Sequence, residues 1–228
     1  MTPEEDEKGA EPTEAGSENT VNWPGDIKGS PTININQEVN IEGVSPSEHA
    51  KALAQIEILK EKLTIAQAAD KEDPTEEEVL AAGEAMEAAE ELEEIGAELD
   101  PWDYIELANA AELRGRTISA AGYNREALRL FLKSGDREGE STSLNNLGLI
   151  ANNRGEYDEA ERLHNESLAI RREIGDRKGE ADSLNNLGVI ANRRSDYDEA
   201  ERLYNEALAI RREIGDRNGE GVVLNNLG

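Results

Sequence analysis

The sequence contains no cysteine, a single phenylalanine and no long apolar run. Without cysteine, disulfide bonds and thiolate-bound metals are excluded. Aromatic residues make up only 4% of the chain and hydrophobic residues 36%, which is little for a packed β-sandwich or barrel of this length. No apolar stretch approaches the roughly 18 residues of a membrane span, and the first residues lack the basic and apolar regions of a signal peptide. We therefore expect a cytoplasmic protein without a membrane partner.

Basic residues are also scarce, and their distribution is uneven. The net charge is −27; the first hundred residues carry 27 acidic and 6 basic side chains, and the remaining 128 carry 24 and 18. An acidic chain repels phosphate backbones, which argues against a nucleic-acid partner. The acidity indicates either a solvated tail with charged helix faces or adaptation to a high-salt cytosol, and composition alone leaves both open.

Helix-forming residues are abundant, so we expect an all-α protein after a different N-terminal region. Residues 1–31 are rich in Glu, Pro, Gly, Ser and Thr, a composition that predicts a disordered acidic tail. In residues 32–44, apolar and polar residues alternate. This pattern predicts either a short β-strand near 32–42, which would need a partner strand such as a second copy of itself, or an extended linker.

Residues 45–100 are predicted to form a two-helix module. The first helix is expected to begin with Ser45 as its N-cap and Pro46 at its first position. Glu48 would complete a capping box with Ser45. The apolar stripe of this first helix is Ala52, Ile56, Leu59, Leu63 and Ala66. It predicts packing against the second helix or a short coiled-coil seam. The second helix is expected to stop before Pro101.

From residue 101 the chain is an array of forty-residue repeats. The block 141–180 aligns without gaps with 181–220 and differs from it at nine of forty positions. The block 101–140 is a more divergent copy, and 221–228 begins a further, truncated one that we expect to be frayed or only loosely docked. The motif LNNLG opens at Leu144, Leu184 and Leu224.

Each repeat predicts two helices joined by short turns. Gly155 marks the turn within one repeat, and Gly175 and Gly215 are expected to be left-handed C-caps of the second helices. Asp176 and Asp216 then cap the helices that follow.

One face of the first helix combines leucines with small residues. Leu144, Leu147, Gly148 and Ala151 recur at i, i+3, i+4 and i+7, which is one face of a helix. A glycine and an alanine on that face indicate a close approach by the facing helix, to which Ala160 contributes. Such a unit buries its apolar face only by stacking on its neighbours.

These repeats resemble tetratricopeptide repeats (TPRs). The signature positions are Leu144, Leu147, Gly148, Ala151, Ala160, His164 and Ser167 in one block and Leu184, Leu187, Gly188, Ala191, Ala200, Tyr204 and Ala207 in the next. The forty-residue period resembles the longer repeats of kinesin light chain and of Pins-type scaffold proteins. The resemblance implies a right-handed superhelix of antiparallel helix pairs, a TPR solenoid, whose concave groove binds a protein or peptide.

A second face of the first helices predicts the binding site. Its residues are Asn145, Leu149 and Asn152 in one repeat and Asn185, Val189 and Asn192 in the next. By resemblance this face lines the groove, where a recurrent amide can bond an extended peptide backbone. Arg154 and Arg194 are expected to add positive charge for an acidic ligand. Asn146 and Asn186 point about 100° away from these residues. They could face a ligand less directly, and the alternative is that they bond to the adjacent helix.

Little in the sequence favours catalysis. The two histidines, His49 and His164, are far apart, and the tyrosine equivalent to His164 in the next repeat predicts a packing role. No phosphate-binding glycine loop occurs. We therefore expect a non-catalytic interaction scaffold without cofactor or metal. The alternatives are a regulatory or assembly subunit that self-associates through residues 33–69, and a fragment of a larger signalling protein.

Overall fold

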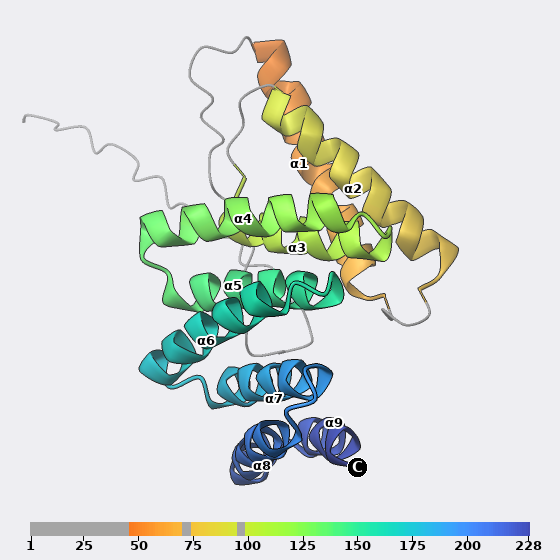
Figure 1. The fold of residues 1–228 in the computed structure, drawn as a ribbon. Coiled ribbons are helices and arrows are strands. Elements are labelled where there is room, and N and C mark those ends of the chain that lie inside the picture. The colour runs from red at the N-terminus through yellow and green to blue at the C-terminus, as the bar shows by residue number, and fades with distance from the viewer. Residues whose placement is uncertain (1–45, 70–73, 95–98) are drawn as a thin grey trace, which may run out of the picture. The chain divides into compact units, whose positions relative to one another are not determined.

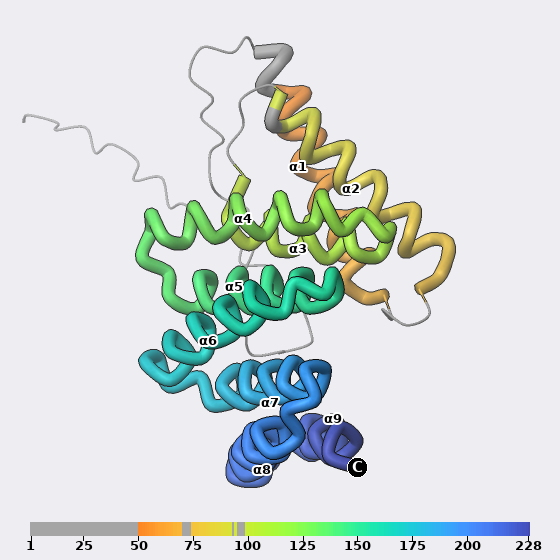
Figure 2. The backbone as a smooth tube through the Cα atoms, viewed as in Figure 1, coloured from red at the N-terminus to blue at the C-terminus, as the bar shows by residue number. Residues whose placement is uncertain are grey.

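All the regular structure that the computed structural model describes is α-helical, as the composition predicts. It describes residues 46–69, 74–94 and 99–228. The helices in these ranges are α1 (Pro46–Gln67), α2 (Glu76–Glu94), α3 (Pro101–Leu113), α4 (Thr117–Ser134), α5 (Arg137–Asn153), α6 (Tyr157–Ile174), α7 (Arg177–Arg193), α8 (Tyr197–Glu213) and α9 (Arg217–Leu227). Each packs on the next along the chain (Figures 1 and 2). The tail expected in residues 1–31 and the strand expected near 32–42 lie outside the described residues.

Helices α1 and α2 form a pair that shares its core with α3. The apolar stripe of α1 is buried at Ala52, Leu59, Leu63 and Ala66, and α1 packs on α2. Packing within the chain, the first of the two readings of that stripe, is therefore the one observed. The start of α2 is a capping box, because the backbone N–H of Thr75 donates to Glu78 (2.7 Å) and the Thr75 hydroxyl accepts from the N–H of Glu78 (3.3 Å).

The pairs α3–α4, α5–α6 and α7–α8 correspond to the three forty-residue blocks. Gly155 turns the chain between α5 and α6 with φ +75°, and Ser195 takes the same left-handed conformation at the next repeat with φ +63°. Gly175 ends α6 in the left-handed region, and the Asp176 carboxylate then accepts the N–H of Gly179 at 2.9 Å. The turns and caps predicted from the sequence are confirmed at these positions.

Two glycines let a ring come close to the first helix of each later repeat. A Cβ on Gly148 would lie 2.7 Å from the nearest ring atom of His164, and one on Gly188 would lie 2.6 Å from the Tyr204 ring. Both rings are buried. His164 is therefore a packing residue equivalent to Tyr204, as the sequence predicts.

The last described segment forms a helix that packs on its neighbours. Residues 217–227 are helical, Val223 is buried against α8, and Asn226 bonds to α7. Leu224 remains exposed. Of the two expectations for this segment, the structure shows docking and not fraying, because one buried valine and one interhelical hydrogen bond hold it. Among the described helices, none is both long and apolar enough to cross a membrane.

Candidate functional site

The residues predicted to bind a ligand lie on two neighbouring helices. Asn145, Leu149 and Asn152 follow one side of α5 at i, i+4 and i+7. The equivalent residues are Asn185, Val189 and Asn192 on α7. Helices α5 and α7 contact each other although a whole helix separates them in the sequence. The fold therefore brings the two predicted sets side by side.

Asparagine side chains join these first helices to one another. Nδ2 of Asn186 on α7 donates to Oδ1 of Asn145 on α5 at 3.1 Å. The same bond recurs between Asn226 on α9 and Asn185 on α7 at 2.9 Å. The second asparagine of LNNLG is thus a donor that links a repeat to the preceding one, which is the alternative that the sequence left open for Asn186.

We call the two bonds from Asn226 to Asn185 and from Asn186 to Asn145 the asparagine ladder. It does not continue into the first repeat. The position equivalent to Asn145 is Ile105, which offers no acceptor. Nδ2 of Asn146 instead donates to Oδ1 of Asn124 on α4 at 3.1 Å. Asn124 is buried, and its own Nδ2 donates to the carbonyl of Ala120. The ladder therefore links α9, α7 and α5 and does not extend to α3.

The ladder sets what the first asparagine can offer to a ligand. Oδ1 of Asn145 and of Asn185 already accepts one hydrogen bond. Their Nδ2 groups, with two N–H bonds each, have no acceptor within hydrogen-bond distance among the residues described. Both side chains are half-buried, so these donors border solvent. The two amides are therefore oriented donors, suited to the carbonyl oxygens of a bound chain.

The remaining positions on this face differ in exposure. Leu149 is 36% exposed, while Val189 is half-buried. Asn192 is exposed, but Asn152 is buried and its Oδ1 has no hydrogen-bond partner among the described residues. Asn152 is thus less accessible to a ligand than the sequence suggested.

The two arginines at the helix ends are engaged unequally. Arg194 bonds to Glu161 at 2.7 Å and to Asp158, both on α6. Among the described residues, Arg154 has a single ion-pair partner, Glu156, at 3.2 Å. The charge of Arg194 is therefore compensated within the protein, whereas Arg154 keeps more of its charge for a partner.

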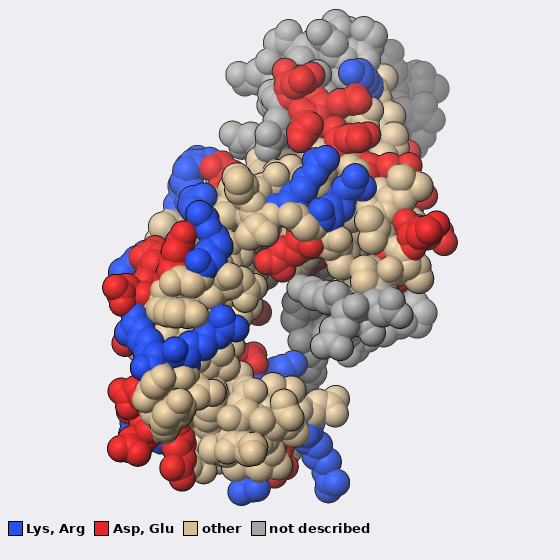
Figure 3. Space-filling view, turned by 45° about the vertical axis from the view of Figure 1, so that its right-hand side comes forward, with Lys and Arg blue, Asp and Glu red and all other residues tan. Residues whose placement is uncertain are grey.

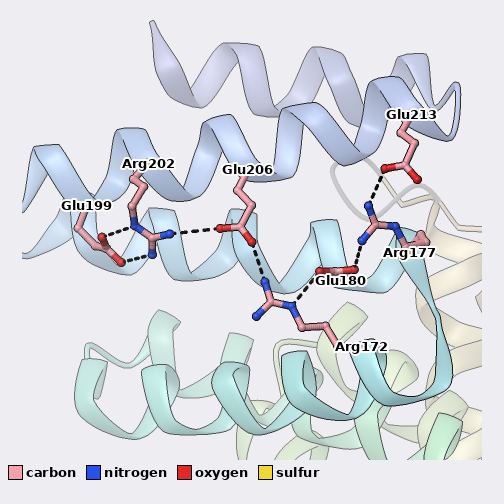
Figure 4. A network of polar contacts seen from close by, with 7 residues as sticks. All are labelled: Arg172, Arg177, Glu180, Glu199, Arg202, Glu206 and Glu213. Atoms are coloured by element: carbon pink, nitrogen blue, oxygen red, sulfur yellow. Dashed lines mark hydrogen bonds and ion pairs between the residues drawn. The ribbon is translucent and has the colours of Figure 1, made fainter.

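The structure also contains a groove that the sequence did not predict. It lies between α6 and α8 and has α7 as its floor. It has a volume of about 420 Å³ and an apolar floor that includes Leu184, Leu187 and Ile190. A network of charged side chains borders it: Arg172 on α6 bonds to Glu180 on α7 (2.8 Å) and to Glu206 on α8 (2.6 Å) (Figure 4). Within α6, Arg162 bonds to Glu166 at 2.6 Å.

Acidic and basic side chains are interleaved in this part of the molecule. Blue and red residues alternate over much of the face in Figure 3. Arg202 on α8 bonds to Glu199 (2.7 Å) and Glu206 (3.2 Å), and Arg177 joins Glu180 to Glu213 (Figure 4). Such carboxylates accept hydrogen bonds from guanidinium groups; Arg162 and Arg202 hold the pKa of Glu159 and of Glu199 below the ordinary value. They are stabilised as anions and are poor proton donors.

The buried histidine is also unsuited to chemistry. Burial, with the charge of Arg171 adding to it, lowers the pKa of His164 to about 4. Neither ring nitrogen has a hydrogen-bond partner among the described residues, and the side chain is fully buried. No group of three or more His, Cys, Asp or Glu side chains in the described ranges is placed to hold a metal.

The comparisons with known proteins identify the repeats. The sequence profile of the tetratricopeptide repeat family matches residues 139–213 and, overlapping them, 179–228. No curated protein shows significant sequence similarity to the chain.

Solved structures share the fold. BtubC (BKLC) from P. vanneervenii is 20% identical with a TM-score of 0.53, covering 80% of this chain and 82% of that one. A kinesin light chain from Podospora anserina with nearly identical TPR-like repeats is 18% identical with a TM-score of 0.52, covering 74% and 83%. Aspartyl phosphate phosphatase F from Bacillus subtilis is 14% identical with a TM-score of 0.60, covering 77% of this chain but 47% of that one. At these identities the likeness concerns the fold, an α-helical repeat solenoid.

Proposed function

We propose that this chain, whose residues 139–228 match the tetratricopeptide repeat family, is a non-catalytic scaffold that binds an extended segment of a partner protein along α5 and α7. The observation that carries the proposal is the pair of oriented amide donors of Asn145 and Asn185, placed once per repeat on adjacent helices. A bound chain in extended conformation presents carbonyl groups at regular intervals, and these donors can bond to two of them.

The surroundings of the two amides support the same binding mode. Leu149 follows Asn145 one turn along α5, and Val189 follows Asn185 on α7, so each amide has an accessible apolar neighbour. Backbone hydrogen bonds would provide affinity, and the apolar residues between them would select side chains of the ligand. Arg154 does not belong to this face, because it lines the groove between α4 and α6.

Self-association through residues 33–69 is the alternative that the sequence raised. The buried stripe of α1 packs on α2 within the chain, so it is not a free dimer seam. Leu53 and Ile58 are the exposed large apolar residues that α1 retains. This alternative stays a prediction, without a described surface that favours it over peptide binding.

The test separates the donors from the ladder. Asn145→Asp with Asn185→Asp keeps an oxygen acceptor for Asn186 and Asn226 but removes the amide donors. Peptides selected from a displayed library of random peptides on the full-length chain serve as probes. We expect the double variant to retain the thermal stability of the wild type and to bind these peptides at least about 10-fold more weakly, the effect of losing two hydrogen bonds of roughly 1 kcal/mol each.

A matched control introduces the same charge elsewhere. Asn205 on α8 and Asn218 on α9 are exposed, and Asn205→Asp with Asn218→Asp adds two carboxylates away from the predicted face. This control should leave the dissociation constants within about twofold. Equal weakening in both double variants would show a general charge effect, and unchanged binding in the first would exclude the face as the peptide site.

A further inference from the structure

The groove between α6 and α8 has an equivalent one repeat earlier, between α4 and α6. This α4–α6 groove has a volume of about 270 Å³, with α5 as its floor. Its apolar residues are Leu128 on α4, Leu144, Leu147, Ile150 and Ala151 on α5, and Leu163 on α6. The repeats thus provide two grooves of the same construction, and their rims can be compared residue by residue.

Ion pairs bridge the helices at both ends of the α6–α8 groove. At one end Arg194, which follows α7, bonds to Asp158 and Glu161 on α6. At the other end Arg172 on α6 bonds to Glu206 on α8 at 2.6 Å (Figure 4). The charged rim of this groove is therefore satisfied by the protein itself.

The α4–α6 groove lacks these bridges because its own residues differ. Ile118 and Ala121 occupy the positions of Asp158 and Glu161, so Arg154 loses both partners found by Arg194. It keeps Glu156 alone, at 3.2 Å.

At the far end of the α4–α6 groove the second bridge is missing as well. Leu132 stands where Arg172 bonds to Glu206, so this bridge has no equivalent at the same position of α4. Glu166, the equivalent of Glu206, is bonded by Arg162 of its own helix. Both ends of this groove are therefore open.

The α4–α6 groove also carries an additional positive charge. Arg125 lines it at the position where the other groove has Asn165. Arg125 is exposed and makes no direct ion pair with any described residue, although its charge helps to lower the pKa of Glu159 on α6. Together with Arg154, which has one direct ion pair among the described residues, it gives the groove two guanidinium groups with few direct partners, on a chain whose net charge is −27.

Two apolar side chains flank these arginines. Ile118 is 85% exposed and Leu132 is 58% exposed, near the two ends of α4. The later repeats have Asp158 and Arg172 at these positions. Fourteen residues of helix separate Ile118 from Leu132, which corresponds to roughly 21 Å. Exposed apolar side chains around a groove are typical of an interaction surface.

From this contrast we propose that the α4–α6 groove is a second docking site, for an acidic partner segment with apolar side chains at its ends. Carboxylates of the segment pair with Arg125 and Arg154, whose planar guanidinium groups bind carboxylates in a bidentate manner. The apolar ends cover Ile118 and Leu132 and remove them from water. This site uses the side of the repeats formed by the second helices, and so goes beyond the peptide-binding face of α5 and α7.

The experiment transfers the rim of one groove to the other. Ile118→Asp with Leu132→Arg gives the α4–α6 groove the residues that bridge the α6–α8 groove, at two exposed positions. The probes are synthetic acidic peptides with glutamates between two leucines, spaced about 6 residues apart for an extended segment or about 14 for a helix. Matching peptides carry lysines in place of the glutamates. Binding to the full-length chain is followed by fluorescence anisotropy.

We expect an acidic peptide to bind the wild type at least about 10-fold more tightly than its lysine counterpart, and less tightly at higher salt. Both Ile118→Asp/Leu132→Arg and the single variant Arg125→Glu should weaken that binding at least about 10-fold. Lys178→Glu makes the same charge change on α7, away from the groove, and should leave it within about twofold.

Four results would overturn the proposal. Equal binding of the lysine peptides would show that charge does not select the ligand. Full binding by the two groove variants, or no binding of either acidic peptide to the wild type, would exclude this site. Loss of binding in Asn145→Asp/Asn185→Asp would place the acidic peptide on the α5–α7 face instead. Arg125 is exposed, so its variant keeps the test decisive even where the double substitution lowers stability.

Discussion

The first and third repeats fill one equivalent place between their two helices in opposite ways. In α3–α4, the rings of Trp102 and Phe131 meet edge to face with centroids 5.0 Å apart. In α7–α8, the same two positions are Asp182 and Arg211, which form an ion pair. Phe131 and Arg211 are both buried. An aromatic contact and a charge pair are thus interchangeable at this place in the fold.

The middle repeat keeps Asp176 as an ion-pair partner of its arginine at 3.8 Å but lacks the second carboxylate. Arg171 is buried, but Thr142 stands where the third repeat has Asp182. Nη1 of Arg171 instead donates to the carbonyl of Gly179 (2.8 Å) and to the hydroxyl of Ser183 (3.1 Å). Burial lowers the pKa of Arg171 below the ordinary value for arginine, which indicates that its charge is incompletely compensated.

What the repeats share is the backbone that surrounds this side chain. The third residue of the next helix is a glycine each time. A Cβ added there would lie 2.3 Å from the Phe131 ring, or 2.6 Å and 2.5 Å from Nε of Arg171 and of Arg211. Space left by the glycine accepts either a ring or a guanidinium group. The repeat geometry therefore determines where a large side chain lies. Whether that side chain is aromatic or charged differs between repeats, together with the residue that it contacts.

The largest expected effect comes from the aromatic version of the contact. Phe131→Ala should lower the free energy of unfolding by about 3–5 kcal/mol, because it removes a fully buried ring and leaves a cavity. Chemical denaturation followed by circular dichroism measures this. The neighbouring Leu132→Ala is the control and should cost less than about 1 kcal/mol, since Leu132 is 58% exposed. Equal losses would show that Phe131 is not the centre of this contact.

A second difference between repeats predicts a dependence on pH. The position facing the small residue of the first helix is His164 in the middle repeat and Tyr204 in the third. Burial lowers the pKa of His164 from 6.5 to about 4, so the unfolded chain binds a proton between these pH values and the folded chain does not. Stability should therefore fall as the pH drops from 6.5 to 4, by about 3 kcal/mol from this residue.

The variant His164→Tyr copies the third repeat and isolates this contribution. Unfolding curves of both proteins between pH 4 and 7 should converge on the neutral side and diverge in acid, with the variant more stable. The many carboxylates contribute to both curves alike and cancel in the difference. Curves that stay parallel would mean that His164 is protonated equally in the folded and unfolded states.

The sequence predicted the features that depend on local geometry and on the period. The helix pairs, the left-handed Gly175 and the caps formed by Asp176 follow from chain-local rules. The packing role of His164 followed from its equivalence to Tyr204. The repeat count supplied the rest of the fold, because stacking repeats bury the faces that single repeats leave apolar.

These local rules did not predict which residues pair with one another across neighbouring repeats. Asn186 finds Asn145 at a separation of 41 residues, and Arg194 finds Glu161 at 33. These contacts depend on the angle between neighbouring helices, which residue patterns do not set. One signal was nevertheless present: Ile118 stands where Asp158 recurs as Asp198 in the aligned blocks. Such breaks in a repeated charge mark the places where two otherwise equivalent grooves differ.

The smallest predicted effect completes the comparison at the middle repeat. Thr142→Asp supplies the carboxylate that Asp182 gives to Arg211, and should raise the free energy of unfolding by about 1 kcal/mol through a partly buried ion pair with Arg171. Thr142→Asn has nearly the same shape without the charge and should give less. In an Arg171→Met background the gain should vanish, because no cation remains to pair. A gain that persists there would mean that the carboxylate acts through the helix start of α5 and not through Arg171.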